Sequence, residues 1–313
     1  MQPLAGRAGP PLVGVVVLDW NGGRETLDAV ESVYASDHPA LAVVLVDNAS
    51  RAPVLEEAAR SHPDLRTIAN PRNLGYAGGN NAGIRAALDA GAEYVLVLNN
   101  DARVAPDAIA RLVEVAERDP AIGAVGAKIV RADDPRRLWL AWGEVSYRQS
   151  LVRLVGAGEL DGERFAEQSD VPWVSGAAIL LARRALEAVG AFDEDFFAYH
   201  EEVDWCARAR AQGFRIAWTP RAVVVHRGQG ASGGPSYVGR RQYLTARNMV
   251  RFVARHGTPW QRAKFAVFLA ATLPFQYLRR LASGEQEGVV QKVRGVRDAL
   301  LGRPIPRSEL DLD

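Results

Sequence analysis

An uncharged apolar run ends in three polar residues in the stretch Tyr94-Val95-Leu96-Val97-Leu98-Asn99-Asn100-Asp101. Such a short apolar run is typical of a strand that is buried on both faces of a parallel sheet. In open α/β sheets, ligands bind beyond the carboxyl ends of the strands. Asp101 and its amide neighbours therefore form a candidate site for a divalent cation that also holds a diphosphate. The alternative is a turn and helix cap before Pro106.

Strand patterns alternate with helix patterns along the first 120 residues. Predicted strands cover 12–18, 41–46, 65–69 and 94–98, and predicted helices cover 26–34, 54–61, 80–90 and 106–118. This alternation predicts an α/β fold with a Rossmann-like, mostly parallel, twisted sheet and helices on both faces.

The remainder of the chain is less regular. Predicted strands cover 123–129, 171–181, 214–219 and 222–226, and predicted helices cover 183–189 and 203–212. A Gly/Ser-rich loop at 228–239 separates these elements from two amphipathic helices, 243–255 and 261–281. The chain therefore ends in a helical extension of the α/β unit.

Charge and cysteine content indicate the kind of partner and the cellular compartment. The net charge is +1, yet residues 229–313 hold 14 Lys or Arg and 6 Asp or Glu, and no carboxylate occurs between Trp205 and Gly284. Such a basic flank attracts nucleic acid, a lipid headgroup surface or a diphosphate. The single cysteine, Cys206, excludes an internal disulfide and fits a reducing compartment. Because no apolar run reaches the roughly 18 residues of a spanning helix, we expect a cytoplasmic protein.

Two further polar segments follow predicted strands. Asp47 ends the strand at 41–46, where a carboxylate can accept hydrogen bonds from a nucleotide base or ribose, or form an Asx turn into Ser50. The Gly/Asn loop at 73–81 could let the backbone approach a ligand closely. It matches neither the dinucleotide fingerprint nor a Walker A loop, which disfavours a dehydrogenase or a P-loop NTPase.

Three carboxylates fall within four positions at Glu201, Glu202 and Asp204. Acids at a helix start are favoured by the helix dipole, and crowded carboxylates also raise one another's pKa, which suits a general base. His226 ends the strand at 222–226, where a neutral imidazole could complete a metal site with Asp101 or serve only the fold.

Taken in order, these segments resemble inverting glycosyltransferases of family two, which have the GT-A fold. The resemblance covers roughly residues 12–230 and is nearest to bacterial rhamnosyltransferase-like members. Its motifs are Val15-Val16-Val17-Leu18-Asp19-Trp20-Asn21, Val46-Asp47-Asn48-Ala49-Ser50, Asn70-Pro71-Arg72-Asn73-Leu74-Gly75-Tyr76-Ala77-Gly78-Gly79-Asn80, Leu98-Asn99-Asn100-Asp101, Ser175-Gly176-Ala177, Gly190-Ala191-Phe192-Asp193 and Tyr199-His200-Glu201-Glu202-Val203-Asp204-Trp205-Cys206.

The sequence departs from the family pattern at two functional positions. Asn99 stands at the first acid of the Asp-x-Asp metal motif, so only Asp101 remains, and the metal depends more on the donor diphosphate. Glu202 stands where the family has its catalytic Asp. Its extra methylene leaves open whether Glu202 or Asp204 is the base.

The resemblance implies a function for each matched residue. It implies transfer of a sugar, from dTDP-rhamnose or a UDP-hexose, to a hydroxyl of a glycan or lipid-linked glycan, with Mg²⁺ or Mn²⁺ as cofactor. The metal ligands would be Asp101 and His226, and the acceptor would meet Trp173, Gly176 and Glu201. The donor would contact Asp19, Asn21, Asp47, Asn73, Gly75, Gly79, Asn80, Asn99 and Asn100.

The resemblance also divides the chain. Residues 1–228 would form the GT-A catalytic domain, with a donor half at about 12–120 and an acceptor half at about 121–228. Residues 229–313 would form a basic, amphipathic helical region. That region fits a helix in a membrane interface, at the inner face of the plasma membrane and near a polyprenyl-diphosphate acceptor. A homodimer interface or a cap on the catalytic domain fits it equally well.

Other functions stay open at this level. A nucleotide-sugar-binding protein with little turnover would explain the two departures. A sugar-nucleotide pyrophosphorylase shares a nucleotide-binding sheet, although 19–24 is a poor version of its Gly-rich loop. The basic flank alone would also suit nucleic acid, but we do not expect that partner.

Overall fold

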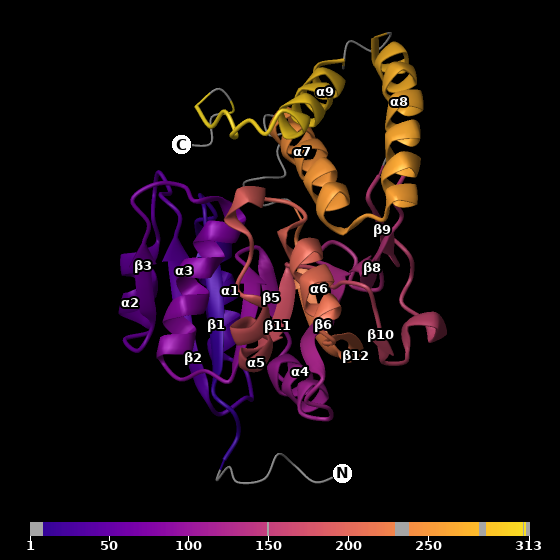
Figure 1. The fold of residues 1–313 in the computed structure, drawn as a ribbon. Helices are drawn as coiled ribbons and strands as arrows, with labels where there is room; N and C mark the ends of the chain where they lie inside the picture. Colours follow the sequence, from indigo (N-terminus) through magenta and orange to yellow (C-terminus); the bar gives the residue numbers. More distant parts are fainter. Residues whose placement is uncertain (1–8, 149, 229–237, 282–285, 309, 311–313) are drawn as a thin grey trace.

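The computed structural model describes residues 9–148, 150–228, 238–281, 286–308 and 310 (Figure 1). Within these residues, ten strands form one sheet. The half nearer the N-terminus is parallel, in the order β4-β1-β2-β3. Its strands are β1 (Val13–Asp19), β2 (Leu41–Asp47), β3 (Arg66–Ala69) and β4 (Tyr94–Asn99).

Strand β1 lies at the centre of the core. Every residue of β1 is buried, which requires cover on both faces of the sheet. Helix α3 (Gly75–Asp89) packs closely on β1, because a side-chain carbon at Gly83 would lie 2.2 Å from Val16. The other helices of this half are α1 (Arg24–Tyr34), α2 (Leu55–Ser61) and α4 (Ala108–Ala116). The predicted mostly parallel α/β sheet is confirmed.

The second half of the sheet is mixed. Strand β11 (Ala178–Ala182) runs antiparallel between β4 and β6 (Ile122–Arg131), and β12 (Arg215–His226) runs parallel to β6. Shorter strands complete the edges, and a two-stranded ribbon lies beside the sheet. They are β5 (Ala102–Val104), β7 (Leu138–Leu140), β10 (Ser169–Asp170) and the ribbon β8 (Trp142–Val145) and β9 (Val152–Val155).

Two predicted strand boundaries were wrong. The strand predicted at 171–181 begins only at Ala178, because Pro172 lacks the backbone N–H that a ladder requires. The two strands predicted at 214–219 and 222–226 are one strand, β12, with a shift in pairing register between Thr219 and Val223.

Two predicted helices also begin earlier than expected. The helix predicted at 80–90 begins at Gly75, whose φ of 74° favours glycine. The helix predicted at 203–212 is α6 (Glu201–Ala211), which follows α5 (Arg183–Val189). The catalytic candidates therefore lie in the first turn of a helix.

The chain ends in three helices, α7 (Val238–His256), α8 (Pro259–Leu281) and α9 (Glu287–Leu300). They confirm the predicted helical extension and lie beyond the carboxyl ends of the parallel strands (Figure 1). Most of the predicted Gly/Ser loop, 229–237, lies outside the described residues. A search of the described helices finds none with the length and apolarity needed to cross a bilayer.

Candidate functional site

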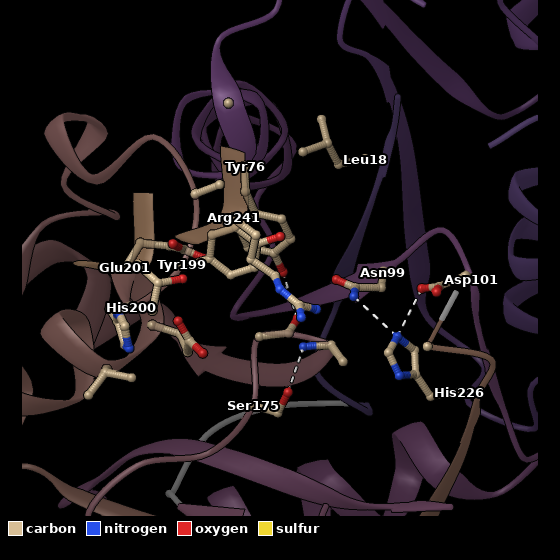
Figure 2. Close-up of a pocket in the computed structure, with 18 of the residues that line it drawn as sticks. Leu18, Tyr76, Asn99, Asp101, Ser175, Tyr199, His200, Glu201, His226 and Arg241 are labelled. Atoms are coloured by element: carbon tan, nitrogen blue, oxygen red, sulfur yellow. Dashed lines mark hydrogen bonds and ion pairs between the residues drawn. The ribbon is translucent and has the colours of Figure 1, made fainter. Parts of the chain in front are cut away.

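A cavity of about 460 Å³ lies where the strand ends, α6 and α7 meet. Ten of the residues predicted for the site line this cavity, although they are spread over more than 150 positions. They are Asn73, Gly75, Asn99, Asn100, Asp101, Trp173, Gly176, Glu201, Glu202 and His226. Figure 2 shows His200 and Glu201 on one side of it and Asp101 and His226 on the other.

Asp101 and His226 meet although 125 positions separate them. Strand β5 pairs antiparallel with the end of β12 and places His226 opposite Ala102. The Nε2 atom of His226 lies 2.9 Å from Oδ1 of Asp101 and 3.3 Å from Nδ2 of Asn99. Both Asp101 and His226 are almost fully buried. The short strand β5 thus assembles the pair that was predicted to hold a metal.

These side chains fit a divalent cation. A carboxylate oxygen and an imidazole nitrogen are suitable ligands, and the buried Oδ1 atom of Asn99 has no hydrogen-bond partner among the described residues. No group of three or more His, Cys, Asp or Glu suited to a metal occurs in the described part of the chain. A cation held by Asp101 and His226 would therefore need oxygen ligands from the substrate, as Mg²⁺ commonly takes from phosphates.

The donor loop is held by hydrogen bonds between amides. Oδ1 of Asn48 accepts from the N–H of Leu74 at 3.0 Å, and Oδ1 of Asn73 accepts from the N–H of Gly75 at 2.8 Å. Nδ2 of Asn48 donates to Oδ1 of Asn73 at 2.8 Å. This network fixes the N-terminus of α3 at the edge of the cavity.

Five predicted donor residues do not line the cavity. Asp19 and Asp47 accept from backbone N–H groups three residues on, at 2.9 and 3.1 Å, so each carboxylate holds the turn that follows its strand. Asn21 accepts from the N–H of Arg51. Gly79 packs against Leu18, and Asn80 donates to its own helix at Tyr76. The contacts that these five residues make within the protein shape the strand ends around the cavity.

The turn before α6 has an unusual backbone. Phe197, Tyr199 and His200 have φ values of 60°, 72° and 71°, which non-glycine residues rarely adopt. Asn248 of α7 holds this turn, because its Nδ2 atom lies 2.8 Å from the carbonyl oxygens of Phe196, Ala198 and Tyr199. Strained turns of this kind cluster at functional sites.

The first turn of α6 contains carboxyl groups with perturbed acidity. Burial raises the pKa of Glu202 to about 7, and burial together with the charge of Glu202 raises the pKa of Glu201 well above its ordinary value. Burial lowers the pKa of His200 to about 4, so this imidazole is neutral at pH 7. The Oε2 atoms of both glutamates lack a hydrogen-bond partner among the described residues. Glu202 can therefore exchange a proton near neutral pH.

Asp204 has different surroundings and does not line the cavity. It is fully buried, and its oxygens lie 2.8–2.9 Å from nitrogens of Arg208, Arg255 and His256. Burial alone would raise its pKa, but the hydrogen bonds from His256 and Arg208 hold that pKa below its ordinary value. The two acids that the sequence left open as bases therefore differ sharply in environment.

The acceptor-side segment forms the opposite wall. The carbonyl of Gly176 accepts from the hydroxyl of Tyr76 at 2.7 Å, which ties this segment to α3. Trp173 is buried, with Gly143 packed against its ring.

The cavity residues that the sequence prediction omitted include Tyr76, Trp139 and Arg241. Tyr76 lies inside the predicted Gly/Asn loop, and its position there was a signal that could have found it. The ring of Trp139 contacts that of His226, with centroids 4.3 Å apart. Arg241 of α7 extends into the cavity between Tyr199 and Asn99 in Figure 2. Only the general basicity of the flank pointed to it.

Comparison with known families and proteins agrees with this site. The glycosyltransferase-like family 2 matches residues 10–251. The N-acetylglucosaminyl-diphospho-decaprenol L-rhamnosyltransferase of Mycobacterium tuberculosis is 27% identical over 245 residues, or 68% of this chain and 75% of that protein. The low-salt glycan biosynthesis hexosyltransferase Agl10 of Haloferax volcanii is 27% identical over 63% of this chain and 62% of its own length.

Solved structures agree on the fold. The mannosyltransferase PcManGT of Pyrobaculum calidifontis, in complex with GDP-Man and Mn²⁺, has a TM-score of 0.59 at 21% identity and covers 94% of this chain and 88% of its own. GalNAc-T7, with UDP, GalNAc and Mn²⁺, has a TM-score of 0.59 at 16% identity and covers 85% of this chain and 58% of its own. The likeness confirms the GT-A fold that the sequence motifs predicted.

Proposed function

The chain belongs to the glycosyltransferase-like family 2, and on this basis we propose that it is a metal-dependent, inverting transferase whose base is Glu202. One observation carries the proposal. A single cavity contains the Asp101–His226 pair on one side and Glu202 on the other. A diphosphate held at the first and an acceptor hydroxyl at the second would place the sugar between them.

The donor is proposed to bind at the strand ends. Asp101 and His226, with Asn99 beside them, would hold Mg²⁺ or Mn²⁺. The bound cation would neutralise the charge that develops on the leaving diphosphate. Arg241 extends into the same cavity and would add positive charge there. The nucleoside would then lie over the turns that Asp19 and Asp47 shape.

The acceptor is proposed to react at the start of α6. Glu202 takes the proton from an acceptor hydroxyl as that oxygen forms its bond to the anomeric carbon. The bond from this carbon to the diphosphate oxygen breaks, and the nucleoside diphosphate leaves with the electron pair. Because attack and departure occur on opposite faces, the anomeric configuration inverts. Asp204 is excluded from this role in the proposal, because Arg208, Arg255 and His256 occupy its oxygens.

The donor proposed first is dTDP-rhamnose, and a UDP-hexose is proposed second. The acceptor is proposed to be a glycan, carried on a polyprenyl diphosphate. The rhamnosyltransferase motifs and the M. tuberculosis relative, whose name specifies a diphospho-decaprenol acceptor and rhamnose, support this choice. The apolar wall formed by Trp139, Val152 and Leu154 would suit the lipid end of such an acceptor.

A screen of nucleotide sugars by thermal unfolding, with and without Mn²⁺, tests the donor proposal. A donor at about 100 times its Kd stabilises the fold by about 2.7 kcal/mol. We expect dTDP-rhamnose to raise the Tm only when Mn²⁺ is present. We expect Asp101→Asn to lower the transfer rate at least about 100-fold and to leave a residual transfer that no longer requires the metal. Metal-dependent transfer that survives in Asp101→Asn would remove Asp101 from the metal site.

A further inference from the structure

Helix α8 carries a continuous stripe of apolar side chains that face solvent. Trp260 is 77% exposed, Val267 68%, Phe275 66% and Leu278 65%. These residues recur at the spacing that puts side chains on one face of an α-helix. The full stripe, here called the α8 stripe, comprises Trp260, Ala263, Val267, Ala270, Ala271, Pro274, Phe275, Leu278 and Leu281.

The α8 stripe is not the face that joins the helix to the rest of the protein. Phe265 and Leu269 lie on the other side of α8 and are buried in the core. Helix α8 is therefore apolar on two faces and uses only one of them in the described structure. Figure 1 shows α8 projecting from the catalytic unit. An exposed apolar patch of this kind marks an interaction surface.

Charge decides between the candidate occupants of the stripe. Helix α8 contains Arg262, Lys264, Arg279 and Arg280 and no carboxylate. In a two-fold dimer through α8, two cationic helices would face each other, and α8 would supply no acid to offset their charge. A surface of anionic lipid headgroups supplies both the apolar layer and the opposite charge. Trp260 also has the amphipathic ring that favours a membrane interface.

Helix α8 lies next to an element that lines the cavity. Lys264 of α8 donates to the carbonyl of Ser146 at 3.2 Å, and the guanidinium of Arg148 lies 5.8 Å from the centroid of Phe268. Ser146 and Arg148 connect β8 to β9, and β9 contributes Val152 and Leu154 to the cavity. A bilayer at the α8 stripe would therefore lie beside the apolar end of the cavity.

We propose that the α8 stripe docks the enzyme on an anionic lipid surface and so presents the cavity to an acceptor that is embedded in that surface. The purpose of the docking rests on the proposed lipid-linked acceptor. The docking itself does not, because it needs neither donor nor transfer.

Flotation with vesicles tests the docking in the full-length protein. We expect the protein to float with vesicles of phosphatidylcholine and phosphatidylglycerol at about 0.1 M salt, at least about tenfold more than with phosphatidylcholine alone. The double substitution Phe275→Glu and Leu278→Glu should reduce flotation at least about tenfold. Leu160→Glu is the matched control, because Leu160 is 57% exposed and lies outside α8. It should float like the wild type.

Three further measurements separate docking from misfolding and from dimerisation. Thermal unfolding and transfer to a short, water-soluble acceptor should be the same in the double variant as in the wild type. Wild-type protein that stays with the aqueous phase, or a double variant that floats normally, overturns the proposal. A dimer in light scattering that the double substitution converts to monomer, without any flotation of the wild type, would assign the stripe to a second copy. Loss of transfer with intact flotation would instead contradict the proposed function.

Discussion

The strand-end turns on the donor side, at Asp19 and Asn48, and the first turn of α6 satisfy their polar groups very differently. On the donor side, Asp19 accepts from Gly22 N–H at 2.9 Å and from the Thr26 hydroxyl at 2.7 Å, and Asn48 is bonded through both its amide atoms. On the α6 side, Oε2 of Glu201, Oε2 of Glu202 and Nδ1 of His200 have no partner among the described residues. Asn48, His200, Glu201 and Glu202 all line the same cavity.

The difference indicates that the two sides have different functions. A saturated hydrogen-bond network fixes geometry, which suits the binding of a nucleotide. A buried acid with one unpartnered carboxyl oxygen has a raised pKa and a tendency to take up a proton, which suits a base. The polar groups of the α6 side are costly to the fold, and the strained turn at 197–200 adds to that cost. Groups that lower the stability of the fold in this way are expected at a site where a reaction is catalysed.

Glu202→Gln should have the largest effect. Removal of a general base lowers kcat by roughly 10²–10⁴-fold, and glutamine keeps the shape of the side chain. We expect the KM for the donor and the Tm to remain close to wild type, since a neutral amide is easier to bury than a carboxylate. Steady-state kinetics and thermal unfolding measure these quantities. Glu202→Asp is the control, and it should retain part of the rate. A kcat within tenfold of wild type for Glu202→Gln would assign the base elsewhere.

Asp204→Asn should damage stability instead of chemistry. Asp204 joins α6 to α7 through Arg255 and His256, and it also binds Arg208. Loss of one member of a buried ionic cluster costs about 3–5 kcal/mol. Denaturant unfolding should show that loss, while kcat of the folded fraction changes only a few fold. The reverse pattern, a large fall in kcat at unchanged stability, would make Asp204 the base.

Asn248 connects the C-terminal helices to the α6 side of the comparison. Asn248→Ala removes the donor to three carbonyl groups of the turn before α6. We expect a loss of about 1–3 kcal/mol of stability and roughly a tenfold fall in kcat, because the turn positions Glu202. The KM for the donor should not change, because the donor side has its own network.

Asn248→Asp provides the matched control for this prediction. It is isosteric but presents only acceptor oxygens to those carbonyls, so its effect should exceed that of alanine. An equal rise of the donor KM in both variants would show that Asn248 supports the cavity as a whole and not the α6 side.

The sequence places Asp19, Asp47 and Asp101 at one edge of the sheet, because parallel strands gather their carboxyl ends there and each of these residues follows an apolar run. Of the three, Asp101 lines the cavity. The position of His226 at a strand end leaves open a metal site with Asp101 or a purely structural role, and the family resemblance implies the metal site. The strand that joins Asp101 and His226, β5, has three residues and no periodic pattern.

The α6 side depends on contacts that no local pattern contains. Glu202 and Asp204 are two positions apart and look alike in the sequence. Their surroundings differ because Arg255 and His256, about 50 residues later, bind Asp204 and not Glu202. Arg241 was missed for a similar reason, since nothing distinguishes it from its neighbour Arg240 until α7 is folded over the cavity.

The pH dependence is the smallest and most specific expected effect. Burial raises the pKa of Glu202 from 4.5 to about 7, so kcat/KM should rise about tenfold per unit below pH 7 and level off above it. Glu201 and His200 face the same turn, but His200 with a pKa of about 4 stays neutral across this range.

The folded state holds the Glu202 proton more tightly than the unfolded chain does. The stability that this proton contributes is therefore full below pH 4.5 and is lost as the pH rises through 7. Activity and stability should thus change in opposite directions over one pH window. Glu202→Gln should abolish the slope in activity and reduce the slope in stability, because burial also raises the pKa of Glu201. A kinetic midpoint near 4.5 would mean that Glu202 is solvated like a surface acid, and the contrast between the two sides of the cavity would then not extend to their acidity.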